Sequence, residues 1–265
     1  MRQDIHCQRE RDHDRLAVSI IPQMEIIVKQ QLASTNRYCE LLDLSQIKEF
    51  TVIQAIEQTH GIGQQGNHWE SAPGENLTIS LILKPTIAVA DQFEITKILS
   101  LGISDALHEI LAGHNHTIAI KWPNDIYVDG KKICGILVAN KIRGNQIAAS
   151  ICGIGLNVNQ TNFPAWVPNP TSLQLLTNVE YSPSKILLKI AESIAKRYYN
   201  NHNPSSREED YLARLLYFNQ QRPFIHLGNQ INGRIVGVNR FGHLQIETDD
   251  GVHLSCQMKE VVFLP

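Results

Sequence analysis

A chain of 265 residues is long enough to bury a substantial core and to form one large domain, or a large domain with a small one. Hydrophobic residues make up 43% of it and charged residues 19%, which is typical of a soluble globular protein. The formal net charge of -2 excludes the uniformly basic surface that coats duplex nucleic acid or attracts anionic membranes.

Two features of the sequence indicate the cellular compartment: the first residues of the chain and the cysteines. Residues 1–20 mix acidic and basic side chains, unlike the apolar centre of a signal peptide, and we expect them to form a disordered extension. Five cysteines are scattered without a Cys-x-x-Cys pair, so neither a disulfide framework nor a zinc site is indicated. No apolar run reaches membrane-spanning length. We therefore expect a cytoplasmic protein with no membrane partner and no metal ligands of its own.

A polar cluster lies between the first two predicted strands, residues 25–28 and 51–56. Ser34 is a good N-cap for a helix through Leu42, and Thr35 and Asn36 follow it directly. Hydroxyl and amide groups thus gather at a helix start, where backbone N–H groups also point outward. A simple cap and a ligand-binding cluster both fit this pattern.

A glycine-rich loop follows at residues 57–71. Gly61, Gly63 and Gly66 lie within six residues, with amide side chains between them, so a regular element is excluded. The loop lacks the Gly-Lys-Ser/Thr of a Walker loop, and no helix pattern follows it as a dinucleotide fingerprint requires. It is best interpreted as a loop whose backbone approaches a ligand closely. A strand at residues 77–83 comes next.

The centre of the chain combines a helix with a hairpin. Residues 91–111 carry apolar side chains on one face, which predicts a packed helix. Two short strands then flank Trp-Pro-Asn-Asp, and Asp-Gly at residues 129–130 predicts a tight turn into residues 133–138. Lys121 precedes the proline corner, where its ammonium would suit a fixed charge facing an anionic substrate. A snorkelling lysine beside a structural turn is the alternative, and spacing alone favours it.

The next strand, residues 146–152, runs into Gly-Ile-Gly-Leu-Asn. Gly-x-Gly at a strand end lets a ligand lie against the main chain, and Asn157 carries an amide that can bind a heterocycle. A glycine-rich bulge with a surface asparagine fits equally well. Helices predicted at residues 171–176, 182–198 and 208–217 would cover one face of a sheet.

Beyond residue 217 the pattern changes to closely spaced short strands. Such strands, separated by Gly-Asn, Asn-Arg-Phe-Gly and Asp-Asp-Gly turns, predict a small barrel over residues 218–265. The strands are expected at residues 224–227, 231–238, 243–246, 252–254 and 261–264. An α+β protein with a large domain at residues 21–217 and a small C-terminal one is therefore predicted.

Several of these segments together resemble one family. Lys-Trp-Pro-Asn-Asp at residues 121–125, with Gly-Lys-Lys-Ile-Cys-Gly-Ile-Leu-Val at residues 130–138, is similar to the central motif of biotin protein ligases, which attach biotin to a carrier lysine. The Ser-Thr-Asn at residue 34, the Gln58 loop and the Gly-x-Gly-Leu-Asn segment also match that family. The resemblance implies a class II synthetase-like catalytic domain, with a mixed sheet and covering helices, followed by an SH3-like barrel.

The resemblance also implies a reaction and a set of site residues. Biotin would attack the α-phosphorus of ATP to give biotinyl-5'-AMP, and a carrier lysine would then take the biotin; Mg²⁺ would accompany the ATP phosphates. Lys121 is the expected catalytic cation, so Lys121→Ala should abolish adenylate formation. Biotin binding is expected from Ser34, Thr35, Asn36, Gln58, Ile62, Gly63, Gln64, Lys121 and Gly135, and nucleotide binding from Trp69, Asn124 and Asn157.

The glycine-rich loop departs from the family pattern. Ile62, Gln64 and Asn67 stand at positions that are usually basic in the Gly-Arg-Gly-Arg type of loop. The loss of these cations is expected to weaken the hold on the intermediate or to slow its formation. Gln64 and Asn67 can still donate hydrogen bonds.

The resemblance implies a biotin carboxyl carrier protein or domain as the partner. The stretch before Glu25 is too short and irregular for the helix-turn-helix domain of biotin-sensing repressors, so we expect a short form that binds no DNA. Whether the chain forms a homodimer stays open. Two alternatives also stay open: a lipoate or octanoate ligase, which shares the catalytic domain, and a catalytically impaired biotin-binding protein.

Overall fold

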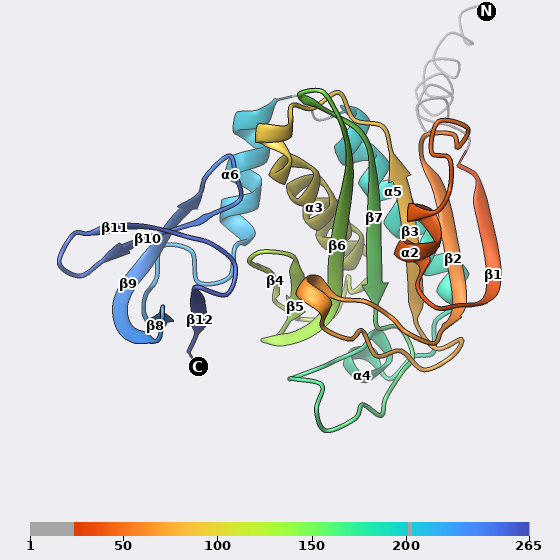
Figure 1. Ribbon diagram of the computed structural model, residues 1–265. Coiled ribbons are helices and arrows are strands. Elements are labelled where there is room, and N and C mark those ends of the chain that lie inside the picture. Colours follow the sequence, from red (N-terminus) through yellow and green to blue (C-terminus); the bar gives the residue numbers. More distant parts are fainter. Residues whose placement is uncertain (1–23, 201–202, 265) are drawn as a thin grey trace, which may run out of the picture.

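A seven-stranded mixed sheet organises the larger part of the molecule (Figure 1). The computed structural model describes residues 24–200 and 203–264, so the predicted extension at residues 1–20 lies outside the described residues. The strand order is β1-β2-β3-β7-β6-β5-β4, in which β1 and β2 are parallel and the other neighbours antiparallel. The strands are β1 (Ile26–Leu32), β2 (Thr51–Gln58), β3 (Leu77–Leu83), β4 (Ile118–Lys121), β5 (Asp125–Val128), β6 (Lys131–Arg143) and β7 (Gln146–Leu156).

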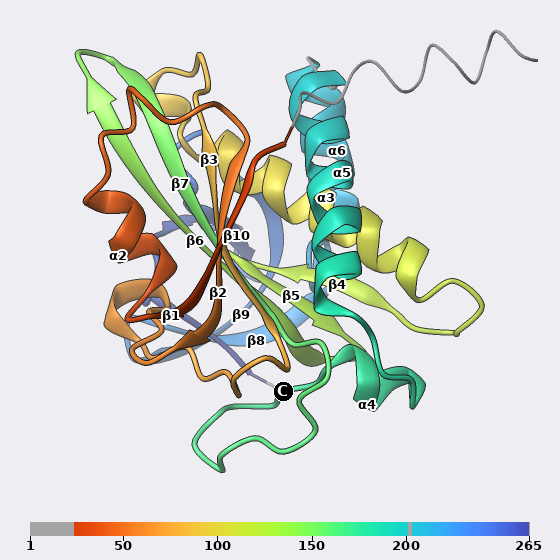
Figure 2. The same cartoon turned by 90° about the vertical axis from the view of Figure 1, so that its right-hand side faces the viewer.

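Helices cover both faces of this sheet. Figure 2 shows α2 on one side and α3, α5 and α6 on the other. Every residue of β3 is buried, as expected for a central strand covered on both faces. None of the helices in the described part of the chain is long and apolar enough to span a bilayer. The helices are α2 (Thr35–Glu40), α3 (Phe93–Ile110), α4 (Leu173–Thr177), α5 (Pro183–Asn200) and α6 (Pro204–Arg214), with short 3-10 turns at Gln64–Gly66 and Val89–Asp91.

Two local predictions can be compared directly with the structure. The Asp-Gly hairpin is confirmed: Asp129 and Gly130 have φ values of 49° and 73° and join β5 to β6. Ser34 does occupy the N-cap position of α2, but its side chain makes no capping hydrogen bond, and α2 ends at Glu40 instead of reaching residue 42. The Ser34 hydroxyl therefore makes no hydrogen bond to the helix that it precedes.

The predicted C-terminal strands form a separate antiparallel sheet. Its order is β11-β10-β9-β8-β12, which leaves β11 and β12 at the two edges. Its strands are β8 (Gln221–His226), β9 (Asn229–Val238), β10 (Leu244–Thr248), β11 (His253–Cys256) and β12 (Val261–Phe263). The sheet lies beside the β4–β5 end of the large sheet (Figure 1).

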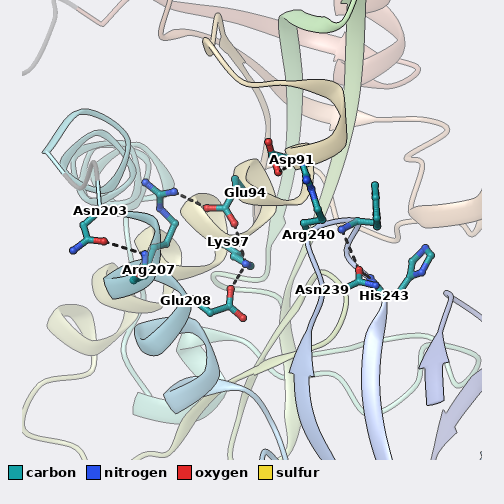
Figure 3. Close-up of polar contacts among 11 residues, drawn as sticks. Asp91, Glu94, Lys97, Asn203, Arg207, Glu208, Asn239, Arg240 and His243 are labelled. Atoms are coloured by element: carbon teal, nitrogen blue, oxygen red, sulfur yellow. Dashed lines mark hydrogen bonds and ion pairs between the residues drawn. The ribbon is translucent and has the colours of Figure 1, made fainter. Parts of the chain in front are cut away.

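The loop between β9 and β10 joins the two sheets. Trp122 of the central motif donates its indole N–H to the carbonyl of Gly242, at 2.9 Å. Arg240 forms a 3.1 Å ion pair with Asp91, just before α3 (Figure 3). The proline corner after β4 is therefore tied to the C-terminal sheet through its tryptophan.

A buried ionic cluster fastens α6 to α3. Lys97 is 3% exposed; its ammonium lies 2.9 Å from Glu94 and also contacts Glu208 (Figure 3). Arg207 of α6 pairs with the second oxygen of Glu94 at 2.6 Å. A buried lysine is tolerable only when it is paired in this way, because desolvation of an isolated ammonium costs several kcal/mol.

A second ionic cluster is expected to make stability depend on acid pH. Burial acts to raise the pKa of Asp105, but hydrogen bonds from Arg197 and Arg214 outweigh it and hold the pKa below its usual range. This contribution to stability is present above the unfolded pKa of about 3.9 and is lost as the pH falls through the folded pKa. Asp105→Asn should lower the free energy of unfolding by about 2 kcal/mol at neutral pH.

Urea unfolding at about pH 7 and about pH 3 measures this effect. The difference between wild type and Asp105→Asn should shrink at the lower pH. Glu180→Gln, at an exposed position, is the control and should change little at either pH. A difference that stays constant across this range would show that the Asp105 carboxylate does not carry the effect.

Candidate active site

The cavity that holds most of the predicted site residues, called the main cavity below, lies where β2, β6 and β7 meet the start of α2 and the glycine-rich loop. Its volume is about 150 Å³. It is lined by Ser34, Thr35, Asn36, Gln58, Ile62, Gly63, Gln64, Asn67, His68, Trp69, Ile79, Asn124, Asp125, Lys132, Gly135, Ile136, Leu137, Gly153, Ile154 and Gly155. The structure therefore brings together every residue predicted to bind biotin except Lys121. Segments more than 100 residues apart in sequence meet here because β6 and β7 are central strands.

The start of α2 forms the polar end of this cavity. Thr35 donates its backbone N–H and its hydroxyl to Oε1 of Gln58, at 2.7 and 3.2 Å. Asn36 donates to the carbonyl of Leu137 at 3.1 Å and accepts from the Ser80 hydroxyl at 2.5 Å. These bonds hold the side chains in place before any ligand binds. The amide nitrogen of Gln58 makes no hydrogen bond to another described residue, so it is available to a ligand.

Glycines on β6 and β7 let the Trp69 indole lie flat against the sheet. A Cβ atom at Gly155 would come within 2.3 Å of this ring, and one at Gly135 within 2.9 Å. Real Cβ atoms do not approach so closely, so only glycine is compatible with this placement. Gly155 and Gly135 thus make room for Trp69, and Trp69 in turn forms a wall of the cavity.

A second, smaller cavity adjoins the first. It has a volume of about 80 Å³ and is lined by His68, Trp69, Glu70, Lys132, Asn157, Phe163, Trp166, Val167, Pro168 and Pro170. Trp69 and Asn157, two of the predicted nucleotide-binding residues, lie here. The third, Asn124, lines the main cavity instead and donates to the carbonyl of Ile136. Its assignment to the nucleotide is therefore not supported by its position.

Sequence analysis missed the segment that closes this second cavity. Phe163 and Trp166 stand in an irregular segment rich in proline, and the side chain of Trp166 is 57% exposed. An exposed tryptophan at the mouth of a cavity is suited to stacking on a flat ligand. The signal was present in the sequence, as two aromatic residues among three prolines within eight residues.

Lys132 is the lysine that lines both cavities. Its ammonium lies 2.8 Å from Asp125 and 5.6 Å from the ring of Trp69, and its side chain is 27% exposed. The backbone of Lys132 is held by Asn169 and Thr171, at 2.8 and 2.9 Å. An ammonium fixed at the junction of two cavities can neutralise anionic groups that enter from either side.

The structure places Lys121 elsewhere. Its ammonium donates to the hydroxyl of Tyr127 at 3.2 Å and lies 5.6 Å from the ring of Phe263 in the C-terminal sheet. It lines neither cavity. The structure therefore does not place Lys121 at either cavity, because β4 is the edge strand of the large sheet and its lysine extends over Tyr127 toward β12.

The glycine-rich loop folds over the main cavity as a small hairpin. Ile62 pairs with His68 in a β-bridge, and the N–H of Gly63 donates to the carbonyl of Asn67 at 2.6 Å. Gln64 donates to the sulfur of Met258 at 2.6 Å, so the loop also touches the C-terminal part of the chain. Residues 59–70 contain no lysine or arginine. Among the described residues that line the main cavity, the one lysine or arginine is Lys132, which lies outside the loop.

Carboxylates are scarce around the two cavities. Within residues 24–200 and 203–264, no group of three or more His, Cys, Asp or Glu side chains is placed to hold a metal ion. Asp125 lines the main cavity but is engaged by Lys132. A divalent cation at this site would need most of its ligands from a bound anion.

Comparison with known proteins shows a family domain and several similar ligases. Residues 28–157 match the model of the biotin/lipoate A/B protein ligase family. The bifunctional ligase/repressor BirA of Bacillus subtilis is 28% identical over 86% of this chain and 70% of its own length. The biotin–[acetyl-CoA-carboxylase] ligase of Paracoccus denitrificans is 30% identical over 54% of this chain and 61% of its own.

Solved structures match over almost the whole chain. The biotin protein ligase of Aquifex aeolicus in complex with biotin and ATP has a TM-score of 0.73 at 24% identity, over 91% of this chain and 98% of that one. The biotin acetyl coenzyme A carboxylase synthetase of Helicobacter pylori has a TM-score of 0.55 at 24% identity, over 88% and 100%. These likenesses establish the fold, including the C-terminal sheet. Residues 28–157 thus carry a domain of the biotin/lipoate A/B protein ligase family.

Proposed function

We propose that this protein is an ATP-dependent biotin protein ligase, which forms biotinyl-5'-AMP and transfers the biotin to a lysine of a biotin carboxyl carrier domain. The proposal rests on one observation. Lys132 and Trp69 line both cavities, so a carboxylate in the first and a phosphate of a nucleotide in the second would meet beside one ammonium. The names of the Paracoccus denitrificans relative and of the Aquifex aeolicus structure support biotin as the acid.

The main cavity suits biotin. Its polar end, formed by Ser34, Thr35 and Gln58, offers donors and acceptors for a cyclic urea. Ile79, Ile136 and Ile154 supply apolar walls for the rest of the ring system and the acyl chain. The carboxylate would then lie toward Lys132.

We assign the second cavity to the nucleotide. Trp69 and Trp166 supply aromatic surfaces for a base, and Asn157 lies at the same cavity, with its side chain anchored to the carbonyl of Thr171 at 2.9 Å. Phe163 and the neighbouring prolines extend the apolar lining. An ATP molecule whose adenine stacks there would place its phosphates toward the junction with the main cavity.

The chemistry proceeds in two displacements. A biotin carboxylate oxygen attacks the α-phosphorus of ATP and pyrophosphate leaves; the deprotonated carrier amine then attacks the acyl carbon and AMP leaves. Lys132 would neutralise both the carboxylate and the developing charge on the α-phosphate, and Asp125 would position its ammonium. Mg²⁺ would arrive with ATP and be held mainly by the phosphates.

The glycine-rich loop would contribute without cations. Gly63, Gln64 and Asn67 line the main cavity and can offer backbone or amide donors to the bound acid. Ile62 adds an apolar surface over the ring. A loop closed in this way would keep water from the mixed anhydride before the carrier lysine arrives.

Transfer to a carrier domain tests this function. The protein is incubated with ATP, Mg²⁺, biotin and a biotin carboxyl carrier domain, and the carrier is examined by intact mass spectrometry. The carrier should gain the mass of one biotin less one water, and a carrier with its target lysine changed to arginine should gain none. An unmodified carrier alongside accumulating biotinyl-5'-AMP would contradict transfer while leaving activation intact.

A further inference from the structure

We propose that His68 binds an oxyanion of the nucleotide at the junction of the two cavities, and that its protonation sets the affinity of the protein for ATP. This inference rests on the proposed function, because it takes the second cavity as the nucleotide site. It concerns a residue that has no part in the scheme above. It makes the nucleotide affinity of this cation-poor site dependent on pH.

The position of His68 is the first argument. It lines both cavities, as Trp69 and Lys132 do, and it is the third such residue. Its ring centroid lies 5.8 Å from that of Trp166, and its side chain is 46% exposed. Its backbone is fixed by the β-bridge to Ile62. The imidazole therefore stands beside the tryptophan that we assign to the base, on the side of the phosphates.

The balance of charge around the cavities is the second argument. Among the described residues that line them, Lys132 is the only lysine or arginine, whereas Asp125 and Glu70 are both carboxylates. One positive charge against two negative charges leaves the lining at -1 while the imidazole is neutral. Protonation of His68 brings the net charge of the lining to zero. A polyphosphate anion should bind the second state better, since like charges repel and a charged imidazole donates a stronger hydrogen bond.

The charge of the incoming ligand decides the direction of the effect. Nε2 of His68 lies 3.4 Å from Glu70, and Lys132 stands across the junction. A phosphate that binds beside the imidazole adds negative charge and favours its protonated form. Histidine is the side chain whose charge ordinarily changes between about pH 5 and 8, whereas carboxylates and lysines keep theirs in that range. Binding of ATP should therefore take up protons, and affinity should fall as the pH rises.

Isothermal calorimetry of Mg²⁺-ATP binding to the full chain tests the inference without relying on activity. The dissociation constant is measured from about pH 6 to about pH 8.5 for wild type, His68→Gln and His68→Lys. His60→Gln is the matched control, since His60 belongs to the same loop but lines neither cavity. Titrations in buffers of different ionisation enthalpy give the number of protons taken up.

Between about pH 6 and about pH 8.5, the ATP affinity of wild type and of His60→Gln should fall about tenfold more than the ATP affinity of His68→Lys. Proton uptake at about pH 7.5 should be present in both and absent from His68→Gln and His68→Lys. Equal proton uptake in wild type and His68→Gln, or parallel affinity profiles for wild type, His68→Gln and His68→Lys, would overturn the inference. A protein that binds ATP with the predicted proton uptake yet forms no biotinyl-5'-AMP would instead contradict the proposed function alone.

Discussion

Lys132→Ala is expected to lower the rate of biotinyl-5'-AMP formation by about a thousandfold, whereas Lys121→Ala should leave the rate within about threefold of wild type. The reason is their placement. The ammonium of Lys132 stands at the junction of the two cavities, and that of Lys121 is held by the Tyr127 hydroxyl outside them. Removal of Lys132 also leaves the Asp125 carboxylate unpaired next to an incoming anion, which adds to the loss.

Single-turnover formation of the adenylate, followed by quenching and mass spectrometry, measures both rates. Lys132→Arg tests whether charge alone suffices, and it should recover only part of the rate because guanidinium and ammonium differ in shape. Circular dichroism and biotin binding show whether each variant is folded. Normal adenylation by Lys132→Ala together with a large loss in Lys121→Ala would restore the assignment made from the sequence.

Gly155→Ala is expected to raise the KM for ATP by about thirtyfold or more, although it adds a single methyl group. Its Cβ would lie 2.3 Å from the Trp69 indole, so the ring must leave its place against β7. Trp69 lines both cavities, and its displacement would alter the biotin and nucleotide sites together. The KM for biotin should therefore rise as well.

Gly237→Ala, in β9, is the matched control. A Cβ atom there meets no atom within 4 Å, so steady-state kinetics should be unchanged. Fluorescence of the tryptophans reports independently whether Trp69 moves in Gly155→Ala. Unchanged KM values in Gly155→Ala would show that the indole is not needed where the structure places it.

Elements defined by local chemistry could be predicted from the sequence. The Asp-Gly turn after β5 follows from backbone conformations that suit those two residues, and α3 from its apolar face. The polar residues at the start of α2 and the glycines of β6 and β7 were recognised by their resemblance to a family. The structure adds the physical reason for those glycines, which is the room that Trp69 and Asn36 require.

The choice between two lysines could not be predicted in the same way. Lys121 and Lys132 both belong to the central motif, and the direction of each side chain depends on where its strand lies in the sheet. β4 is an edge strand beside the C-terminal sheet, whereas β6 is next to the centre. Strand order is a tertiary property, and no local pattern in residues 117–138 reveals it.

The segment that closes the second cavity was missed for a different reason. Residues 163–170 have no regular structure, so their position depends on contacts such as that between Lys132 and Asn169. Their aromatic and proline content indicates a binding loop only after a neighbouring cavity is known. The same holds for His68, which gains its significance from the cavities on either side of it.

Formation of the acyl-adenylate by purified protein tests the central claim most directly. The protein is incubated with ATP, Mg²⁺ and biotin, lipoate or octanoate, and the products are identified by mass spectrometry. The arrangement of Lys132 between the two cavities, with a polar end suited to a cyclic urea, predicts biotinyl-5'-AMP and no adenylate from the other two acids. An adenylate from lipoate or octanoate, or bound biotin without any adenylate, would contradict it.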